Sequence, residues 1–448
     1  MNFSDIIKSY DVRGVYPDQI NEEHVRILGG AFVKYLGAKT VAVGRDCRTS
    51  SPAFHTALIA GITEQGANVI DIGEATTPMV YHAAGTLDVD GAIMITASHN
   101  PPEYNGMKFV RSGAIPIGKE SGLAEISEIA EQSPFTPAEH PGDVHPIDIK
   151  TSYSDFITKY ADIDGSVLTA VVDPGNMMGV LDIEILKKLS PALSVSAIFD
   201  KLDGTMPNHE ANPLNKETLT DLQTEVTKQE ADIGIAYDGD ADRIGFVDEQ
   251  GRVIQPHLIT ALLARHILSK NPAAAIAYDV PSSRSVNEEI TKHGGTPLLT
   301  KVGTANIKSE MREQEAIFGG EFSGHYYFKD HFYSEAPTLV AILVLNMMVR
   351  ENKPLSELID AVQHYHHSGE MNYELAPNTN KNAMLTQFKD TYSDGELTEL
   401  DGIRVDFPDW WFLVRPSNTE PLMRMVVEAA TPKLLEEKKL ELSKIIDK

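Results

Sequence analysis

The chain has 448 residues, which is too long for one hydrophobic core and predicts three or four domains, since a domain usually holds about 100 to 200 residues. Its formal charge of -26 at pH 7, from 65 acidic and 39 basic residues, argues against a general role in binding nucleic acid or an anionic membrane. Cys47 is the only cysteine, and we expect no disulfide, secretory signal or membrane-spanning stretch. A cytoplasmic protein is therefore expected.

Hydrophobic periodicity in the first part of the chain predicts helices and strands in alternation. Helical spacing predicts helices from Glu22 to Gly37, across residues 51–66 and near residues 77–84. Strands are expected in TVAVG, NVIDIG and GAIMIT, which follow these helices in turn. The resulting β-α-β-α-β order is typical of a parallel sheet covered by helices on both faces.

The same order of elements returns twice, in residues 166–237 and 274–320. In each of the three copies the third predicted strand runs directly into a polar motif: TASHNP, DGDADR and EFSGH. Ligands in open α/β sheets bind outside the carboxyl ends of the strands. We therefore expect three similar sheet edges to face one cleft.

Changes in composition suggest where the domains begin and end. The stretch EQSPFTPAEHPGDVHPIDIK, at residues 131–150, has four prolines and no periodicity, and is interpreted as a linker or surface excursion. Residues from 370 onward predict a small α+β domain, with strands in GIRVDF, WWFLVR and LMRMVVEA and a closing helix from Pro432. The apolar run LVAILVLNMMV is expected to be a buried helix. The predicted domains are residues 1–145, 146–250, 251–367 and 368–448.

The motif DGDADR places three carboxylates at alternate positions after a predicted strand: Asp238, Asp240 and Asp242. Carboxylates this close repel one another unless a hard cation lies among them, and oxygen ligands of this kind suit Mg²⁺. A solvated acidic turn stays open as an alternative. A calcium loop of the EF-hand type is disfavoured, because Arg243 stands at the sixth position, where that loop needs glycine. A phosphatase with Asp238 as its nucleophile is a further alternative.

The stretch TASHNPPEYNGMK presents Ser98 at the end of a predicted strand, and Pro101 and Pro102 block helical continuation and fix the exit of the chain. By itself the stretch is compatible with a plain turn, and it has no G-x-S-x-G elbow. Beside a three-aspartate metal site and Arg243, Ser98 is better interpreted as a phosphoryl carrier. A cation and a guanidinium stabilise charge on a phosphoryl group during its transfer.

Two later motifs contain residue types that bind phosphate and sugar. RPSNTEP, at residues 415–421, groups a guanidinium with hydroxyl and amide side chains, which predicts an anion site or, alternatively, a capped turn. GGEFSGH places a carboxylate and a hydroxyl between glycines, and such groups at strand ends suit vicinal sugar hydroxyls. The histidines of HYHH, at residues 364–367, are expected on a solvated face.

In this order and over the whole chain, the four motifs resemble those of the α-D-phosphohexomutase family, and within it the bacterial phosphomannomutase/phosphoglucomutase branch. TASHNPPEYNGMK is similar to the family's phosphoserine loop, and DGDADR to its magnesium loop. GGEFSGH is similar to the sugar-recognition loop, and RPSNTEP to the phosphate-binding loop. The opening segment KSYDVRG resembles the family's N-terminal active-site segment.

The resemblance implies a role for each matching residue. Ser98 would be the phosphorylated serine, and an oxygen of its phosphate would complete the Mg²⁺ site of the three aspartates. The residues expected at the phosphoryl-transfer end are Tyr10, Arg13, His99, Lys108 and Arg243. Either His99 or Lys108 would transfer protons. The residues expected to bind the sugar and its unreactive phosphate are Glu321, Ser323, His325, Arg415, Ser417, Asn418 and Thr419.

The fold and reaction of the family are implied in the same way. The fold would be α/β, with three similar domains of mixed, mainly parallel sheets and a smaller C-terminal α+β domain around a central cleft. The reaction would be a relay in which phosphoserine passes its phosphoryl group to a hexose monophosphate, and the enzyme takes back the other phosphoryl group from the hexose 1,6-bisphosphate. Mannose 6-phosphate and mannose 1-phosphate, or the two glucose phosphates, or both pairs would be interconverted by a monomer or homodimer.

Two positions depart from the pattern of the family, and three alternatives stay open. Thr304 in KVGTA stands where many phosphomannomutase relatives have histidine, so the acid/base assignment in the third domain is left open. Phe322 in GGEFSGH differs from the glutamine common in phosphoglucosamine mutases. The alternatives are a phosphoglucosamine mutase, a Mg²⁺-dependent sugar phosphatase that uses Asp238, and a sugar-phosphate-binding protein without turnover.

Overall fold

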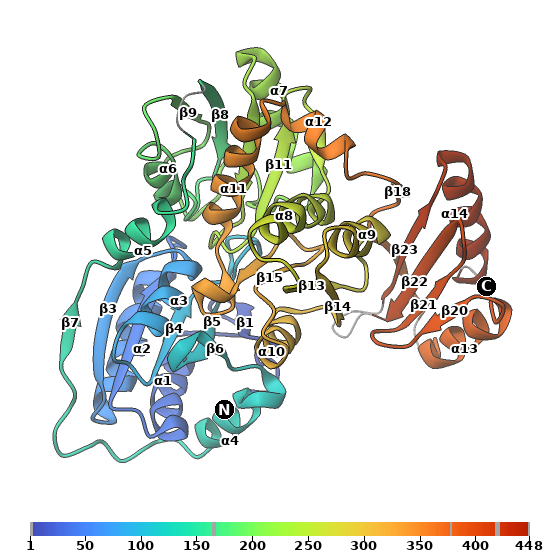
Figure 1. Ribbon diagram of the computed structural model, residues 1–448. Helices are drawn as coiled ribbons and strands as arrows, with labels where there is room; N and C mark the ends of the chain where they lie inside the picture. The colour runs from blue at the N-terminus through green and yellow to red at the C-terminus, as the bar shows by residue number, and fades with distance from the viewer. Residues whose placement is uncertain (1–2, 164–166, 377–378, 417–421, 447–448) are drawn as a thin grey trace. The chain divides into compact units, whose positions relative to one another are not determined.

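One strand arrangement occurs three times along the chain (Figure 1). In each copy the first strand lies in the middle, hydrogen-bonded in parallel to the second strand on one side and to the third on the other. In the order first, second and third, the strands are β2 (Thr40–Arg45), β3 (Asn68–Glu74) and β4 (Gly91–Ile95), then β8 (Leu168–Asp173), β9 (Leu193–Ala197) and β10 (Ile233–Tyr237), then β13 (Ala275–Asp279), β14 (Thr296–Thr300) and β15 (Phe318–Gly320). The predicted repeat is confirmed.

Helices connect these strands, as the right-handed crossover of parallel strands requires. The helices of the three copies are α2 (Ser51–Glu64) and α3 (Thr77–Thr86), α6 (Val180–Leu186) and α7 (Thr220–Gln229), and α9 (Arg284–Lys292) and α10 (Thr304–Glu313). Other helices precede the copies or lie between them: α1 (Glu22–Leu36), α4 (Leu123–Glu131), α5 (Ile149–Thr158) and α8 (Pro256–Lys270). α1 begins where the Asn21 side chain accepts hydrogen bonds from two backbone N–H groups, and it ends at Gly37, whose φ of 63° suits glycine.

Antiparallel strands extend the first two sheets. After Pro102 the chain returns as β5 (Tyr104–Arg111), which pairs with β4 and with β1 (Val12–Val15) and carries the short β6 (Ile115–Pro116). The second sheet continues into β11 (Ile244–Asp248) and β12 (Val253–Ile254), and β16 (Tyr326–Phe328) and β17 (Ser334–Glu335) form an antiparallel pair. Both sheets are therefore mixed.

The proline-rich stretch at residues 131–150 corrects one expectation. It contains β7 (Val144–Pro146), which pairs in parallel with β3 at the edge of the first sheet. An edge strand needs only backbone groups on one side, and proline is tolerated there. Sequence periodicity therefore gave no sign of it.

The last part of the chain is an antiparallel sheet with helices against one face (Figure 1). Its elements are β18 (His366–His367), β19 (Met371–Glu374), α13 (Lys381–Thr391), β20 (Glu396–Thr398), β21 (Ile403–Asp406), β22 (Trp410–Pro416), β23 (Leu422–Ala429) and α14 (Pro432–Ile446). Side chains alternate along β22: Phe412 and Val414 lie in the core under the helices, whereas Trp411 and Leu413 pack with Val280. This confirms the small α+β domain.

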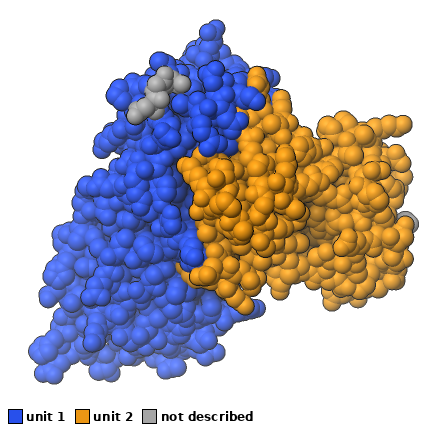
Figure 2. Space-filling model, in the orientation of Figure 1, with its two compact units in different colours: residues 1–255, 323–356 blue, residues 256–322, 357–448 orange. Residues whose placement is uncertain are grey.

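The structure is a computed structural model, and it describes residues 3–163, 167–376, 379–416 and 422–446. The chain divides into two compact units, shown in different colours in Figure 2. The first unit holds residues 1–255 and 323–356, and the second holds residues 256–322 and 357–448. The predicted domain boundaries and the central cleft stay predictions.

The apolar run at residues 339–349 lies in α11 (Pro337–Glu351), which is almost entirely buried and is followed by α12 (Leu355–Asp360). The expected buried helix is confirmed. Within the described ranges, no helix has both the length and the apolar character needed to cross a membrane. The fold class, three similar α/β domains and a smaller C-terminal domain, is likewise confirmed.

A buried carboxylate in the first unit makes stability depend on pH. Asp182 on α6 is 1% exposed, and its Oδ1 accepts no hydrogen bond from the described residues. Burial raises the pKa of Asp182 to about 7, although a hydrogen bond with Thr338 opposes the shift. Between its unfolded value and about 7, the folded state holds a proton that the unfolded state has lost. Stability therefore falls as pH rises through that window.

We expect Asp182→Asn to unfold at a higher temperature than the wild type at pH 8, because the amide removes a buried charge worth up to about 4 kcal/mol. The difference should shrink toward pH 5. Calorimetry of both proteins at the two pH values measures it, with Asp155→Asn at an exposed position of α5 as the control. If the unfolding temperatures of the wild type and Asp182→Asn changed with pH by the same amount, the raised pKa of Asp182 would be contradicted.

Candidate active site

The loop that follows β4 holds Ser98 in an uncommon backbone conformation. Ser98 is buried, and its φ of 52° lies in the left-handed region, which serine seldom adopts. Its backbone N–H donates a 2.9 Å hydrogen bond to the Thr96 hydroxyl. Such a conformation persists only where the surroundings hold it, and it is common at functional sites.

Arg48 supplies much of that support. Its guanidinium is buried and donates to four backbone carbonyls of the loop, those of Ser98, Asn100, Pro101 and Tyr104, at 2.6 to 3.0 Å. Asp46 balances its charge, with 3.2 Å between Arg48 Nε and Asp46 Oδ2. The planar fork of arginine suits several acceptors at once. Arg48 therefore fixes the course of the loop through its carbonyl groups.

The loop that follows β10 lies directly against the Ser98 loop. A Cβ at Gly239 would stand 2.2 Å from the Ser98 carbonyl oxygen, so only glycine fits there. The close approach brings Ser98 Oγ within 2.9 Å of Asp238 Oδ2, to which it donates a hydrogen bond. Two motifs 140 residues apart in sequence thus form one site.

The three aspartates are fully buried, and each has one oxygen held by the protein. Asp238 Oδ1 accepts the backbone N–H groups of Asp242 and Arg243, both at 3.0 Å. Asp240 Oδ2 accepts from Thr77 Oγ1 at 2.5 Å and Lys108 Nζ at 2.6 Å, and Lys108 also pairs with Asp242. The second oxygens of Asp240 and Asp242 accept no hydrogen bond from the described residues, whereas that of Asp238 accepts the Ser98 hydroxyl.

The donor set fits a hard divalent cation. One oxygen of each aspartate lies within 4.8 Å of one oxygen of each of the others. Asp240 Oδ1 is buried and accepts no hydrogen bond from any described residue. A buried carboxylate oxygen left without a donor is costly, whereas Mg²⁺ takes such oxygens as ligands.

Charge also indicates a cation site. Burial and the two neighbouring carboxylates raise the pKa of Asp238 well above its usual range. Burial opposes the ionised form of Lys108, yet Asp240 and Asp242 still raise the pKa of that ammonium well above its usual range. One ammonium is thus shared by two carboxylates. A further positive charge would favour the ionised form of Asp238.

Two other predicted residues, His99 and Arg13, contact the Ser98 loop. His99 Nδ1 lies 3.2 Å from Ser98 Oγ, and the Arg243 guanidinium, together with burial, lowers the pKa of His99 well below its usual range. Arg13 donates to the Asn100 side chain and pairs with Asp11. Tyr10 is 43% exposed and lies just before β1.

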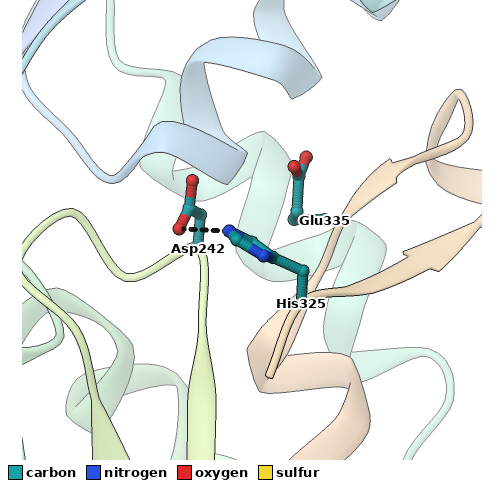
Figure 3. Close-up of side chains that lie close together, drawn as sticks. All are labelled: Asp242, His325 and Glu335. Carbon is teal, nitrogen blue, oxygen red and sulfur yellow. Dashed lines mark ion pairs between the residues drawn. The ribbon is translucent and has the colours of Figure 1, made fainter. Parts of the chain in front are cut away.

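His325 faces the aspartate loop (Figure 3). Its Nε2 lies 3.2 Å from Asp242 Oδ1 and accepts a hydrogen bond from Arg243 Nε at 3.2 Å, and its Nδ1 lies 2.7 Å from Ser323 Oγ. Buried Glu335, from β17, completes a group in which ligand atoms of Asp242, His325 and Glu335 are within 4.8 Å of one another (Figure 3). His325 is thus fixed at the edge of the aspartate site rather than apart from it.

Glu321 belongs to the second unit, where a buried pair of carboxylates forms. Glu321 Oε1 accepts the Gly303 N–H at 2.7 Å, and both oxygens of Asp279 lie 3.1 Å from the Phe322 N–H. Burial and the neighbouring Glu321 raise the pKa of Asp279 well above its usual range. Hydrogen bonds from both sides therefore fix the position of the Glu321 loop.

Arg415, also in the second unit, lies opposite Arg424 in the register of β22 and β23. Glu370 bridges them, with Oε2 at 2.7 Å from Arg415 and Oε1 at 3.1 Å from Arg424. Like charges directly opposite in a sheet repel, and Glu370 offsets this. Ser417, Asn418 and Thr419 lie outside the described residues.

Sequence reasoning missed several residues of the site, namely Arg48, Thr77, Glu335, Glu370 and Arg424. Of these, only Thr77 lies in a local pattern that predicts its position. The sequence TTP at residues 76–78 is typical of a helix N-terminus, and the Thr76 side chain caps α3. The others act through contacts between distant segments, which spacing along the chain does not reveal.

Comparison with known proteins assigns the chain to a class. It matches the phosphoglucomutase/phosphomannomutase family in all four parts: alpha/beta/alpha domains I, II and III over residues 4–136, 151–251 and 255–365, and the C-terminal domain over residues 370–445. The chain belongs to this family, whose members are intramolecular phosphotransferases and therefore isomerases. The predicted family and enzyme class are confirmed.

Individual relatives agree along nearly the full length. Phosphomannomutase of Escherichia coli strain K12 is 36% identical over 432 residues, which is 94% of each chain. The protein named phosphohexose mutases of Xanthomonas campestris is 36% identical over 444 residues and 98% of each. The crystal structure of a phosphoglucomutase/phosphomannomutase family protein from Burkholderia thailandensis matches with a TM-score of 0.90 at 31% identity, covering 99% of this chain and 97% of that one.

Arg48→Lys tests how the Ser98 loop is held. Lysine keeps the charge beside Asp46 but cannot reach four carbonyls, so we expect the fold to persist and turnover to fall by about 10- to 100-fold. Turnover and the unfolding midpoint are measured together, with Arg45→Lys, whose partner Glu74 is 40% exposed, as the control. Unchanged turnover in Arg48→Lys would show that these bonds do not position Ser98.

Proposed function

We propose that this enzyme interconverts mannose 6-phosphate and mannose 1-phosphate, the corresponding glucose phosphates, or both pairs, through phosphoserine at Ser98 and a hexose 1,6-bisphosphate. The hydrogen bond between Ser98 Oγ and Asp238 Oδ2 carries this proposal. It places a hydroxyl able to carry a phosphoryl group at the edge of a site whose three carboxylates suit Mg²⁺. The name of the relative from Escherichia coli, phosphomannomutase, supports mannose phosphate as a substrate, and that of the relative from Xanthomonas campestris, phosphohexose mutases, supports a hexose phosphate.

In the proposed relay, the bond between phosphorus and Ser98 Oγ breaks as a sugar hydroxyl oxygen bonds to phosphorus. The sugar hydroxyl loses its proton, and Ser98 Oγ regains one. His99, whose neutral imidazole lies 3.2 Å from Ser98 Oγ, is the proposed proton acceptor, and Lys108, whose ammonium stays protonated between two aspartates, is the proposed donor. Arg243 lies near Asp238, where it would stabilise the charge of the phosphoryl group.

Asp238, Asp240 and Asp242 would hold Mg²⁺, with an oxygen of the phosphoserine as a further ligand. When bound, Mg²⁺ would neutralise charge on the phosphoryl oxygens during transfer. Four donors keep the carboxylates aligned: the backbone N–H groups of Asp242 and Arg243, the Thr77 hydroxyl and the Lys108 ammonium.

The residues that recognise the substrate are assigned by the same proposal. Glu321, Ser323 and His325 would bind sugar hydroxyls, and Arg415 would bind the phosphate that is not being transferred, with Ser417, Asn418 and Thr419 beside it. Buried Arg415 Nε makes no hydrogen bond to any described residue, which leaves a donor for an anion. Hexose 1,6-bisphosphate would serve as intermediate and activator, and we propose a cytoplasmic monomer or homodimer.

Ser98→Ala tests the relay. We expect a loss of more than about 1,000-fold in mutase turnover, because no other hydroxyl can carry the phosphoryl group. A coupled assay with Mg²⁺ and trace hexose 1,6-bisphosphate is run on mannose 1-phosphate, glucose 1-phosphate and glucosamine 1-phosphate. Ser112→Ala, at an exposed position after β5, is the control.

The outcomes separate the candidate reactions. Turnover of the mannose or glucose phosphate that disappears with Ser98 supports the proposal. Turnover of glucosamine 1-phosphate alone would identify a phosphoglucosamine mutase. Activity that survives in Ser98→Ala and disappears in Asp238→Asn would identify a phosphatase with Asp238 as its nucleophile.

Thr77→Val tests the alignment of Asp240. Valine has the shape of threonine but cannot donate a hydrogen bond, so Asp240 loses one of the two groups that fix its Oδ2. We expect the affinity for Mn²⁺, used as a spectroscopic probe for Mg²⁺, to fall by about 10- to 100-fold. Electron paramagnetic resonance measures free Mn²⁺ without any turnover.

Thr77→Ser is the matched control, because serine keeps the hydroxyl and should bind Mn²⁺ as the wild type does. Equal affinity in Thr77→Val and Thr77→Ser would contradict a role for the hydroxyl. If the wild-type protein binds no Mn²⁺, the assignment of the three aspartates as metal ligands fails instead.

A further inference from the structure

A stack of aromatic rings in the second unit joins the GGEFSGH loop to the C-terminal sheet. The Phe322 ring is stacked on His257 and His367, with centroid distances of 5.6 and 5.2 Å. His367 also contacts His257 at 4.6 Å and meets the edge of Trp411 at 5.8 Å. Four rings from separate parts of the sequence therefore form one cluster, in which His257 and Trp411 are buried, Phe322 and His367 are half-buried, and His367 contacts all the others.

Two hydrogen bonds fix the His367 ring in one orientation. Its Nε2 lies 2.9 Å from the Pro281 carbonyl, which can only accept, so Nε2 carries the proton. Its Nδ1 lies 3.0 Å from the Gly369 N–H, which can only donate, so Nδ1 accepts. These partners define a neutral imidazole whose plane cannot rotate without losing both bonds.

Each end of the stack is attached to a group that the proposed function uses. Phe322 directly follows Glu321, and its own N–H is held by Asp279. Trp411 and Arg415 both lie on β22, four residues apart, so their side chains leave the same face of the strand.

Trp411 is itself fixed at its far end. Its Nε1 donates to Glu428 at 2.6 Å, and the Arg404 guanidinium lies 3.8 Å above its ring. A ring held by a hydrogen bond and by a cation above its face has little freedom to tilt. The stack thus runs from the Glu321 loop to the strand that carries Arg415, and hydrogen bonds hold both His367 and Trp411 within it.

We propose that His367 is a positioning residue that sets the spacing between the Glu321 carboxylate and the Arg415 guanidinium. It thereby favours ligands that carry sugar hydroxyls and a phosphate on one molecule. The inference rests on the proposed function, in which Glu321 binds hydroxyls and Arg415 binds phosphate. A ligand that needs only Arg415, such as inorganic phosphate, gains nothing from this spacing.

The test compares these two kinds of ligand in the full-length protein. His367→Gln keeps a neutral donor and acceptor but removes the ring, and His367→Phe keeps the ring but removes both bonds. Calorimetric titrations measure the binding of glucose 1-phosphate, mannose 1-phosphate and inorganic phosphate. His366→Ala, at an exposed position one residue earlier, is the control, and unfolding midpoints show that each variant is folded.

For His367→Gln we expect hexose phosphate affinity to fall by about 10-fold or more, while inorganic phosphate affinity changes by less than about 2-fold. His367→Phe should stay within about 3-fold of the wild type for hexose phosphate, because the stack remains. Phe322→Leu should mimic His367→Gln, and the double variant should be no worse than either single one, because both changes interrupt the same connection.

Two results would overturn the inference. One is an equal loss for both ligands in His367→Gln, which indicates general damage to the fold. The other is a hexose phosphate affinity in His367→Gln that matches His366→Ala. Failure of the proposed function is a separate result: the wild-type protein would then bind neither hexose phosphate.

Discussion

The close approach of two loops at Gly239 is the constraint on which the phosphoryl-transfer site depends. A single Cβ there would collide with the Ser98 carbonyl, and the hydroxyl of Ser98 could no longer reach Asp238. The aspartate loop is also held from other sides. The Met178 N–H donates to the Gly239 carbonyl at 3.1 Å, and the Thr77 N–H donates to the Asp240 carbonyl at 2.9 Å. Backbone hydrogen bonds thus hold the aspartate loop, while the Arg48 side chain holds the Ser98 loop against it.

Charge balance explains why the aspartates are accompanied by so many donors. Moving a carboxylate out of water into a protein interior costs roughly several kcal/mol, unless opposite charge and hydrogen bonds compensate for the lost hydration. Lys108 serves two carboxylates at once, and Arg243 lies 3.8 Å from Asp238. The chain as a whole is strongly acidic, but at this site the cationic side chains of Lys108 and Arg243 balance part of the negative charge.

Much of the scaffold could be predicted from the sequence, because it depends on local patterns. The parallel strands such as β8 and β13 are short apolar runs between helical segments, and their order alone predicts a sheet covered by helices. β5 was missed, since YNGMKFVR includes a glycine and charged side chains and shows no regular alternation. β7 was missed because an edge strand can form from backbone pairing alone.

The site was predictable to the extent that its chemistry lies in contiguous motifs. Ser98 and the three aspartates each follow a strand, and the principle that sites form at strand ends brings them together. Arg48 and Thr77 also follow strand ends, those of β2 and β3, but neither lies in a polar motif that marks it, and each acts on a loop that is 50 or more residues away. Arg48 in particular looks like any other basic residue in the sequence, and only its burial among carbonyl oxygens gives it a role.

The repeated strand order has a consequence for how such a protein can change over evolutionary time. In the first two copies the loop after the third strand is closed by an antiparallel neighbour, β5 after β4 and β11 after β10. Both stems of the loop are thus tied into the sheet by hydrogen bonds. Substitutions between the stems can alter the chemistry while the framework stays the same. One architecture, used three times, can therefore supply a serine in one copy, carboxylates in the next and a ligand-binding loop in the third. The sheet that carries each loop does not have to change.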